Sequence, residues 1–172
     1  MIVGQRERFA VEIDVAMVID GWVYGSFIFW IDGMKVGDMS DLSVDLKGCW
    51  HWMRDFIENP MDRFEPGLYE MDKRQIYLRL ASPILYGGDP TGFAKEMYQQ
   101  TYERFHVAHI GMSSFDNVAL LLVKDKDGRE HLVWEDGGEI RDAFLGAGCM
   151  EEVLGEAVAA LEGIVISAGD KR

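Results

Sequence analysis

The sequence predicts an α+β fold in which hairpins form a mainly antiparallel sheet and about three amphipathic helices pack against it. Asp-Gly pairs at 20–21 and 32–33 separate apolar segments, and such short turns join antiparallel strands. Residues 42–58 and 150–161 repeat apolar side chains at helical spacing, so each segment presents one apolar face to a core.

The N-terminal hairpins predict a β-meander. Apolar residues alternate with polar or small ones from Phe9 to Val15, the period of a strand with one buried face. Residues 22–31 are apolar on both faces, which favours a central strand. A short third strand follows at 34–36.

Two helices have clear start or stop signals. The helix at 42–58 is predicted to begin at Asp41 as N-cap and to end before Pro60. The last helix covers 150–161, and Gly163 is predicted to cap its C-terminus.

The middle of the chain supplies the remaining elements. A strand is predicted at 75–80, with Pro83 marking its end or an edge. Asp89 and Pro90 form a helix-start signal for a helix that runs to about residue 104. A second hairpin covers 117–134, and residues 140–145 add an edge strand.

Length and composition predict a single domain over residues 1–172, with a core from about 8 to 163. Hydrophobic residues make up 48% of the chain, enough for a sizeable core. Cys49 and Cys149 offer neither a disulfide framework nor a CxxC metal motif.

The sequence shows neither a secretory signal nor a membrane-spanning segment, which predicts a soluble, cytoplasmic protein. The first three apolar residues are followed at once by polar and charged ones, unlike a secretory signal. The longest apolar run, 118–123, is far shorter than a membrane-spanning helix.

Net charge indicates the kind of partner to expect. Seventeen Lys and Arg stand against 30 Asp and Glu, a formal net charge of -13. Such a field repels nucleic acid and anionic membranes and attracts a basic protein.

The sequence motifs indicate no catalytic residue, no metal and no cofactor. His106 and His109 form an HxxH without the further ligands of a zinc site. The turn at 125–128 resembles the start of a calcium loop but lacks its later ligands, and the glycines at 87–92 lack the Gly-Lys-Ser/Thr ending of a phosphate loop. Ser113 and Ser114 lie outside a GxSxG motif.

Four sequence features together resemble the immunity protein 42 family of bacterial polymorphic-toxin systems, over residues 1 to about 162. The features are MIVGQRERFAVEIDV at 1–15, WVYGSFIFWIDGMKVGD at 22–38, SFDNVALLLV at 114–123 and Trp134. The resemblance implies a small cytoplasmic protein, not an enzyme, that binds a cognate secreted toxin domain and occludes its active surface. Gly25, Trp30 and Gly33 match the family pattern and are interpreted as hairpin geometry and core.

The charge suggests where such a toxin would bind. Many toxins that act on nucleic acid are basic, so an acidic surface would steer association and cover their substrate cleft. The hypothesis places this surface on and beside the second hairpin, at Asp125, Asp127, Glu135, Asp136 and Glu139. A merely solvated loop is the alternative.

Two other functions stay open at this point. A small enzyme or ligand-binding domain would assemble its site only in three dimensions, as a pocket with polar groups such as His106, His109 or Asp116. An adaptor would show an exposed apolar patch instead. The toxin's identity and the oligomeric state are left undetermined.

Overall fold

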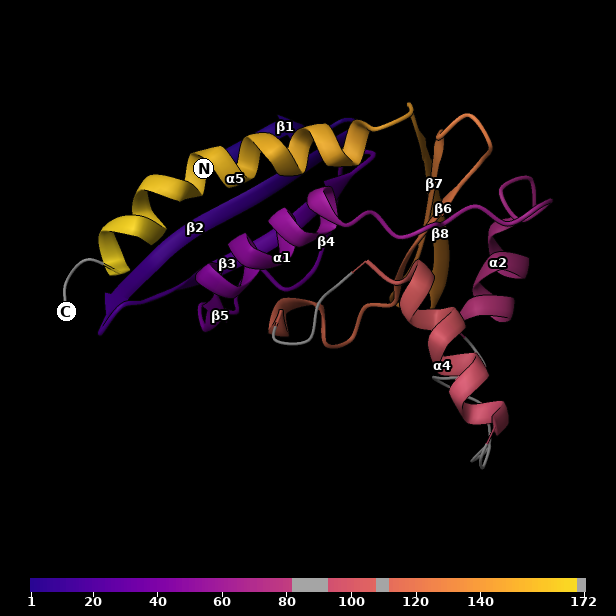
Figure 1. Ribbon diagram of the computed structural model, residues 1–172, viewed down its shortest axis with the longest axis horizontal. Helices are drawn as coiled ribbons and strands as arrows, with labels where there is room; N and C mark the ends of the chain where they lie inside the picture. The colour runs from indigo at the N-terminus through magenta and orange to yellow at the C-terminus, as the bar shows by residue number, and fades with distance from the viewer. Residues whose placement is uncertain (82–92, 108–111, 170–172) are drawn as a thin grey trace. The chain divides into compact units, whose positions relative to one another are not determined.

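The computed structural model describes residues 1–81, 93–107 and 112–169. The chain divides into two compact units: unit 1 comprises residues 1–60, 109–117 and 149–172, and unit 2 comprises 61–108 and 118–148. Each unit combines an antiparallel sheet with helices, which confirms the predicted α+β class (Figure 1). The single domain over residues 1–172 stays a prediction.

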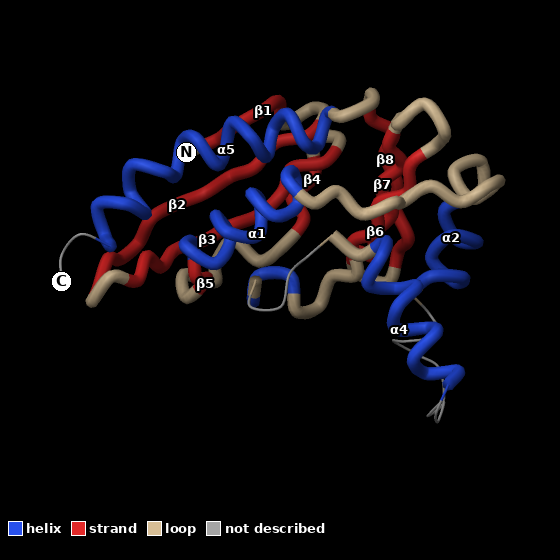
Figure 2. Tube along the Cα trace, in the orientation of Figure 1, coloured by secondary structure: helices blue, strands red, loops and turns tan. Residues whose placement is uncertain are grey.

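Unit 1 is a five-stranded antiparallel sheet with the order β1-β2-β3-β4, in which β5 also pairs with β3. Helices α1 and α5 contact each other; α1 packs on β3, and α5 packs on β1, β2 and β3 (Figure 2). The elements are β1 (Ile2–Gln5), β2 (Phe9–Ile19), β3 (Trp22–Ile31), β4 (Met34–Val36), β5 (Val44–Asp45), α1 (Leu46–Glu58), the 3-10 turn η1 (Ser113–Phe115) and α5 (Cys149–Gly169).

The predicted meander is confirmed by β2, β3 and β4. Asp20 and Gly21 have φ values of 48° and 83°, as a primed two-residue turn requires. Asp32 and Gly33 repeat this geometry, with φ values of 50° and 76°. Strand β1 was not predicted, because its four residues are too few for an alternating pattern.

The start of α1 differs from the prediction. Asp45, not Asp41, is the N-cap, and its carboxylate accepts the Lys47 backbone N–H at 3.0 Å. Val44 and Asp45 pair with β3, so the chain is strand here and the helix begins only at Leu46; the Leu42 side chain is exposed. Asp41 instead accepts a hydrogen bond from the Ser113 hydroxyl.

The end of α5 also differs from the prediction. The helix continues through Gly163 to Gly169, so Gly163 is not its cap. Val165 and Ala168 are buried, and this extra apolar surface outweighs the cost of about 1 kcal/mol for an internal glycine.

An aromatic cluster forms the core of unit 1. Phe29 is fully buried, and its ring centroid lies 5.4 Å from that of Phe9, 5.4 Å from that of Phe27 and 5.0 Å from that of Phe115. Trp52 of α1 packs against the rings of Phe27 and Phe29. Ser114, buried in η1, donates its hydroxyl to the Phe27 carbonyl at 2.7 Å, which satisfies an acceptor of β3 that neither β4 nor β5 reaches.

Unit 2 is a three-stranded antiparallel sheet in the order β6-β7-β8. The predicted second hairpin and the predicted edge strand are both present. The elements are α2 (Lys73–Leu80), α4 (Phe93–Phe105), β6 (Leu120–Lys124), β7 (Glu130–Asp136) and β8 (Glu139–Leu145).

The strand predicted at 75–80 is wrong, because this segment is helix α2. Ile76, Tyr77 and Leu80 lie on one side of the helix and are buried. Asp72 caps the helix by accepting the Arg74 backbone N–H at 2.9 Å. Pro83, Asp89 and Pro90, which were predicted to end and start elements, lie outside the described residues.

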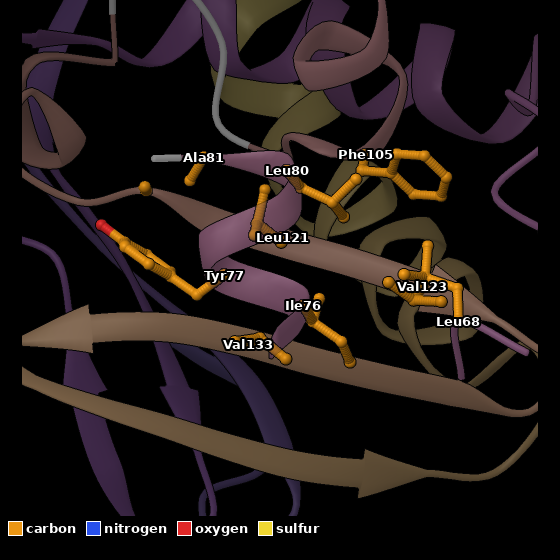
Figure 3. Packing of buried hydrophobic residues seen from close by; sticks show 10 residues of the cluster. Leu68, Ile76, Tyr77, Leu80, Ala81, Phe105, Leu121, Val123 and Val133 are labelled. Carbon is orange, nitrogen blue, oxygen red and sulfur yellow. The ribbon is translucent and has the colours of Figure 1, made fainter. Parts of the chain in front are cut away.

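The core of unit 2 lies between α2, α4 and the sheet, and Figure 3 shows most of its side chains. Leu80 and Phe105 approach from the helices, and Leu121, Val123 and Val133 approach from β6 and β7. The prediction that helices pack on an antiparallel sheet therefore holds within each unit.

Candidate functional site

The predicted acidic surface begins at the β6–β7 turn, where Asp125 holds the turn together. Its carboxylate accepts the backbone N–H groups of Asp127 and Arg129 at 2.9 and 2.8 Å and pairs with the Arg129 guanidinium at 2.6 Å. Burial disfavours the charged form, but these hydrogen bonds outweigh it and lower the pKa of Asp125. Asp125 is 6% exposed, whereas Asp127 is exposed and offers its carboxylate to solvent.

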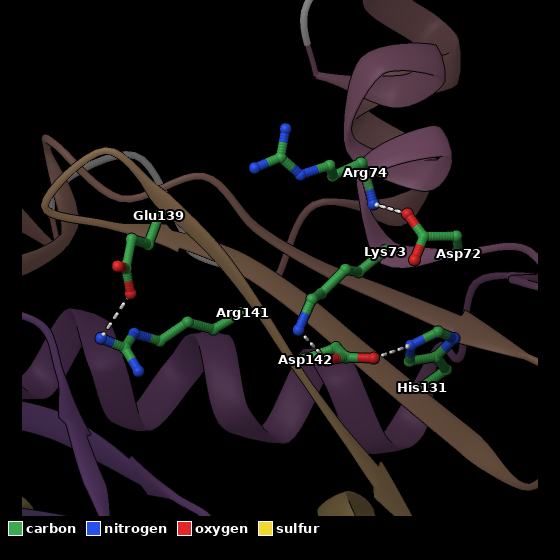
Figure 4. Close-up of polar contacts among 7 residues, drawn as sticks. All are labelled: Asp72, Lys73, Arg74, His131, Glu139, Arg141 and Asp142. Carbon is green, nitrogen blue, oxygen red and sulfur yellow. Dashed lines mark hydrogen bonds and ion pairs between the residues drawn. The ribbon is translucent and has the colours of Figure 1, made fainter.

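The other three acidic residues meet at the β7–β8 turn. Asp136 and Glu139 are opposite each other in the ladder, and both are exposed. The Arg141 guanidinium lies between them, 3.2 Å from Asp136 and 3.1 Å from Glu139 (Figure 4 shows the Glu139 contact). Glu135 is half-buried and accepts the Tyr77 hydroxyl at 2.6 Å.

The structure therefore brings Glu135, Asp136 and Glu139 together but not the whole predicted set. Asp125 and Asp127 lie at the opposite end of β7, because the two turns lead into and out of the same strand. Seven residues of extended chain separate the two ends by roughly 20 Å. Of the five residues, the exposed carboxylates are Asp127, Asp136 and Glu139.

A polar cluster that the sequence did not indicate lies on β7 and β8. His131 is buried, with Nδ1 3.0 Å from the Tyr69 carbonyl oxygen and Nε2 3.2 Å from the Asp142 carboxylate. Lys73, at the start of α2, donates to the same carboxylate at 2.9 Å (Figure 4). One sign of this cluster is present in the sequence, His131 within the predicted second hairpin. Lys73 and Asp142 are far apart along the chain, so their contact could not be predicted.

The Asp142 carboxylate should make the stability of unit 2 depend on pH. Burial raises the pKa of Asp142, but the contacts with Lys73 and His131 together lower it by more. The net shift of the pKa is therefore downward. Its stabilising effect is therefore present above the unfolded-state pKa of about 3.9 and is lost as the pH falls through the folded-state pKa.

We expect Asp142→Asn to lower the free energy of unfolding by about 1–3 kcal/mol at pH 7. The difference from the unmutated chain should shrink as the pH falls below about 4. Urea unfolding at several pH values measures this, and Asp127→Asn at an exposed position serves as the control. An unchanged difference between pH 7 and pH 3 would contradict the role assigned to the charge.

His106, a candidate polar group of the alternative ligand site, and the Cys49 thiol both pack within the fold. The His106 ring stacks on Tyr102 at 4.6 Å, and burial lowers its pKa. Burial, aided by Asp45, raises the pKa of the Cys49 thiol to about 12. Among the described residues, no group of His, Cys, Asp or Glu is arranged to hold a metal ion, and His109 lies outside them.

Two surface hollows bear on the alternative of a ligand-binding domain. One, of about 320 Å³, is lined by residues of β1, β2 and α5; the other, of about 300 Å³, lies between the β2–β3 turn and α1. Neither has His106 or Asp116 among its described lining residues. The second hollow is lined by Asp20, Gly21, Trp22, Asp45, Lys47, Gly48 and His51.

The end of the β2–β3 hairpin is an exposed apolar surface that sequence reasoning missed. Met17, Val18, Ile19 and Trp22 are each about half exposed, from 47 to 51%. The Trp22 ring stacks on Tyr24, with centroids 6.3 Å apart. Residues 22–31 were predicted to form a central strand, but Trp22 at the start of β3 is about half exposed.

The residues shared with the family pattern have distinct roles. Gly33 forms its turn, as predicted. Gly25 is in the middle of β3, where the backbone of Asp14 leaves no room for a side chain. Trp30 is half-buried, donates to Glu12 at 2.6 Å and lies beneath the Arg6 guanidinium, 4.5 Å from its ring centroid.

Comparison with known proteins identifies the family. No curated protein and no solved structure matches the chain. Within the described residues, no helix has the length and apolar character to cross a membrane. The sequence matches the family described as Immunity protein 42 over residues 1–160, which is the resemblance predicted from the sequence. The chain belongs to the immunity protein 42 family, and a toxin-neutralising role follows from that membership.

Proposed function

We propose that this protein binds the toxic domain of a cognate secreted or contact-dependent toxin in the cytoplasm and neutralises it by covering the active surface. The family supplies the neutralising role and implies a toxin as partner. The observation that supports occlusion is the net charge of -13. An excess of carboxylates favours a basic partner and accelerates its association.

The charge is carried by exposed carboxylates on regular elements and tight turns. Helix α5 contains no Lys or Arg along its whole length, and Glu152, Glu156 and Glu162 are exposed on it. In unit 2, Asp127, Asp136 and Glu139 project from the two turns of the sheet. We retain the predicted contact surface in this narrower form, because Asp125 and Glu135 are engaged within the fold.

The proposal predicts stoichiometric inhibition. The test co-expresses this chain with the toxin domain encoded beside its gene, measures growth rescue and then titrates the purified toxin. Full inhibition at a fixed molar ratio, with a complex that co-purifies, supports occlusion. Inactivation by a small fraction of one equivalent would instead indicate an enzyme and contradict the proposal.

Charge reversal tests the predicted surface. We expect the triple variant Asp127→Lys, Asp136→Lys and Glu139→Lys to weaken toxin binding by about tenfold or more and to reduce its dependence on salt. The control reverses three exposed carboxylates elsewhere, Glu7, Asp55 and Glu103. Equal affinity and equal salt dependence for the triple variant and the unmutated chain would exclude this surface.

A further inference from the structure

Strand β2 extends well beyond its partner on the outer side of the sheet. Strand β1 pairs with β2 only from Phe9 to Glu12, and the last contact is the Ile13 N–H donating to the Met1 carbonyl at 2.9 Å. Residues 14–19 continue as strand and pair with β3 on their inner side. No described strand pairs with their outer side, which we call the open edge.

The open edge lacks most of the features that usually protect a free strand. Residues 15–19 carry no charge and no proline, and Met17, Val18 and Ile19 are about half exposed. Natural edges are protected by charged side chains, proline or bulges. Only a bulge between Val15 and Met17 is present here.

Strand β8 provides a contrast within the same chain. It is also an edge strand, but Glu139, Arg141 and Asp142 place charges along it. These charges protect the edge of β8 against pairing with another strand. The difference between the two edges marks β2 as the one suited to accept another strand.

The turn geometry shows which backbone groups are free. Ile19 and Trp22 flank the two-residue turn and face each other, so they exchange hydrogen bonds across the hairpin. Backbone groups alternate along a strand, so the N–H and C=O of Val18 point to the open edge. A strand laid beside β2 would bond to them.

We propose that the open edge accepts an extended segment of the toxin domain as an added antiparallel or parallel strand. This inference rests on the proposed function, because the toxin is the partner. Main-chain hydrogen bonds would provide affinity, and the apolar side chains beside them would select the segment. The added strand would extend the sheet of unit 1 into the partner.

Charge defines the chemistry of that segment. Asp14 and Asp20 are exposed at the two ends of the uncharged run. A strand with alternating apolar residues and a Lys or Arg near each end would complement this arrangement. A second copy of this chain fits poorly, because each copy carries a net charge of -13 and would bring its own Asp14 and Asp20.

Amide hydrogen exchange on the full chain, alone and with the co-purified toxin domain, tests the inference. We expect exchange at the outward-facing Val18 amide to slow by about tenfold or more in the complex. A complex that forms without this protection overturns the inference and leaves the proposed function intact. Failure to form any complex overturns both. Protection that rises with the concentration of the free chain would assign the edge to a second copy and also overturn it.

Substitution of Val18 separates backbone from side-chain effects. Val18→Pro removes the outward N–H but no bond to β3, so the hairpin should remain folded while toxin affinity falls about tenfold. Val18→Thr keeps the N–H and the branched shape, and its affinity should stay within about threefold. Equal affinities for the two variants would overturn the inference. If the proline variant unfolds, the exchange experiment on the unmutated chain decides.

Discussion

Gly25→Ala is expected to unfold unit 1, with a loss of about 4 kcal/mol or more in the free energy of unfolding. A Cβ atom added at Gly25 would lie 1.9 Å from the Asp14 carbonyl oxygen and 2.9 Å from the Leu46 Cδ1 atom. The first of these atoms belongs to the backbone of β2, and the second is on α1. Relief of the clash would require the two central strands to separate, since a backbone oxygen has no other rotamer.

Urea unfolding followed by circular dichroism measures this loss, and Gly33→Ala is the matched control. Gly33 has a φ of 76° and nothing within 4 Å of an added Cβ atom, so its substitution should cost only the backbone strain, about 1 kcal/mol. A Gly25→Ala variant as stable as Gly33→Ala would show that β2 and β3 do not approach so closely. The comparison therefore tests the close approach itself.

The parts of the fold that sequence reasoning predicted correctly depend on local chemistry. The Asp20-Gly21 and Asp32-Gly33 turns need positive φ values, and the strands beside them alternate or are apolar throughout. Helix α2 was missed because a short segment with few apolar residues fits a strand as well as a helix. The cap at Asp45 was missed because Val44 pairs with β3, a contact that no local pattern reveals.

The candidate surface was harder to predict because it depends on which elements meet. Five carboxylates near one hairpin in sequence lie at two ends of β7, since the turns before and after this strand are at its opposite ends. The open edge depends on where β1 stops pairing with β2. Residues 15–19 look like any half-buried strand until that partner is known.

Length and composition predict a single domain, and the way the chain connects its two units allows a test of it. Unit 1 is assembled from three segments, and unit 2 supplies both of the connections between them, residues 61–108 and 118–148. If unit 2 unfolds, these connections become long flexible loops, and their closure entropy opposes the folding of unit 1. We therefore expect the two units to lose stability together.

Phe105→Ala tests this coupling. Phe105 is fully buried in the core of unit 2, and its truncation should cost about 3–5 kcal/mol. Amide exchange should then accelerate in β2 and β3 of unit 1 as well as in β6 and β7 of unit 2. Leu78→Ala, at an exposed position of α2, is the control and should change neither. Faster exchange confined to β6 and β7 would mean that the chain folds as two domains, because the sheet of unit 1 would then keep its stability without unit 2.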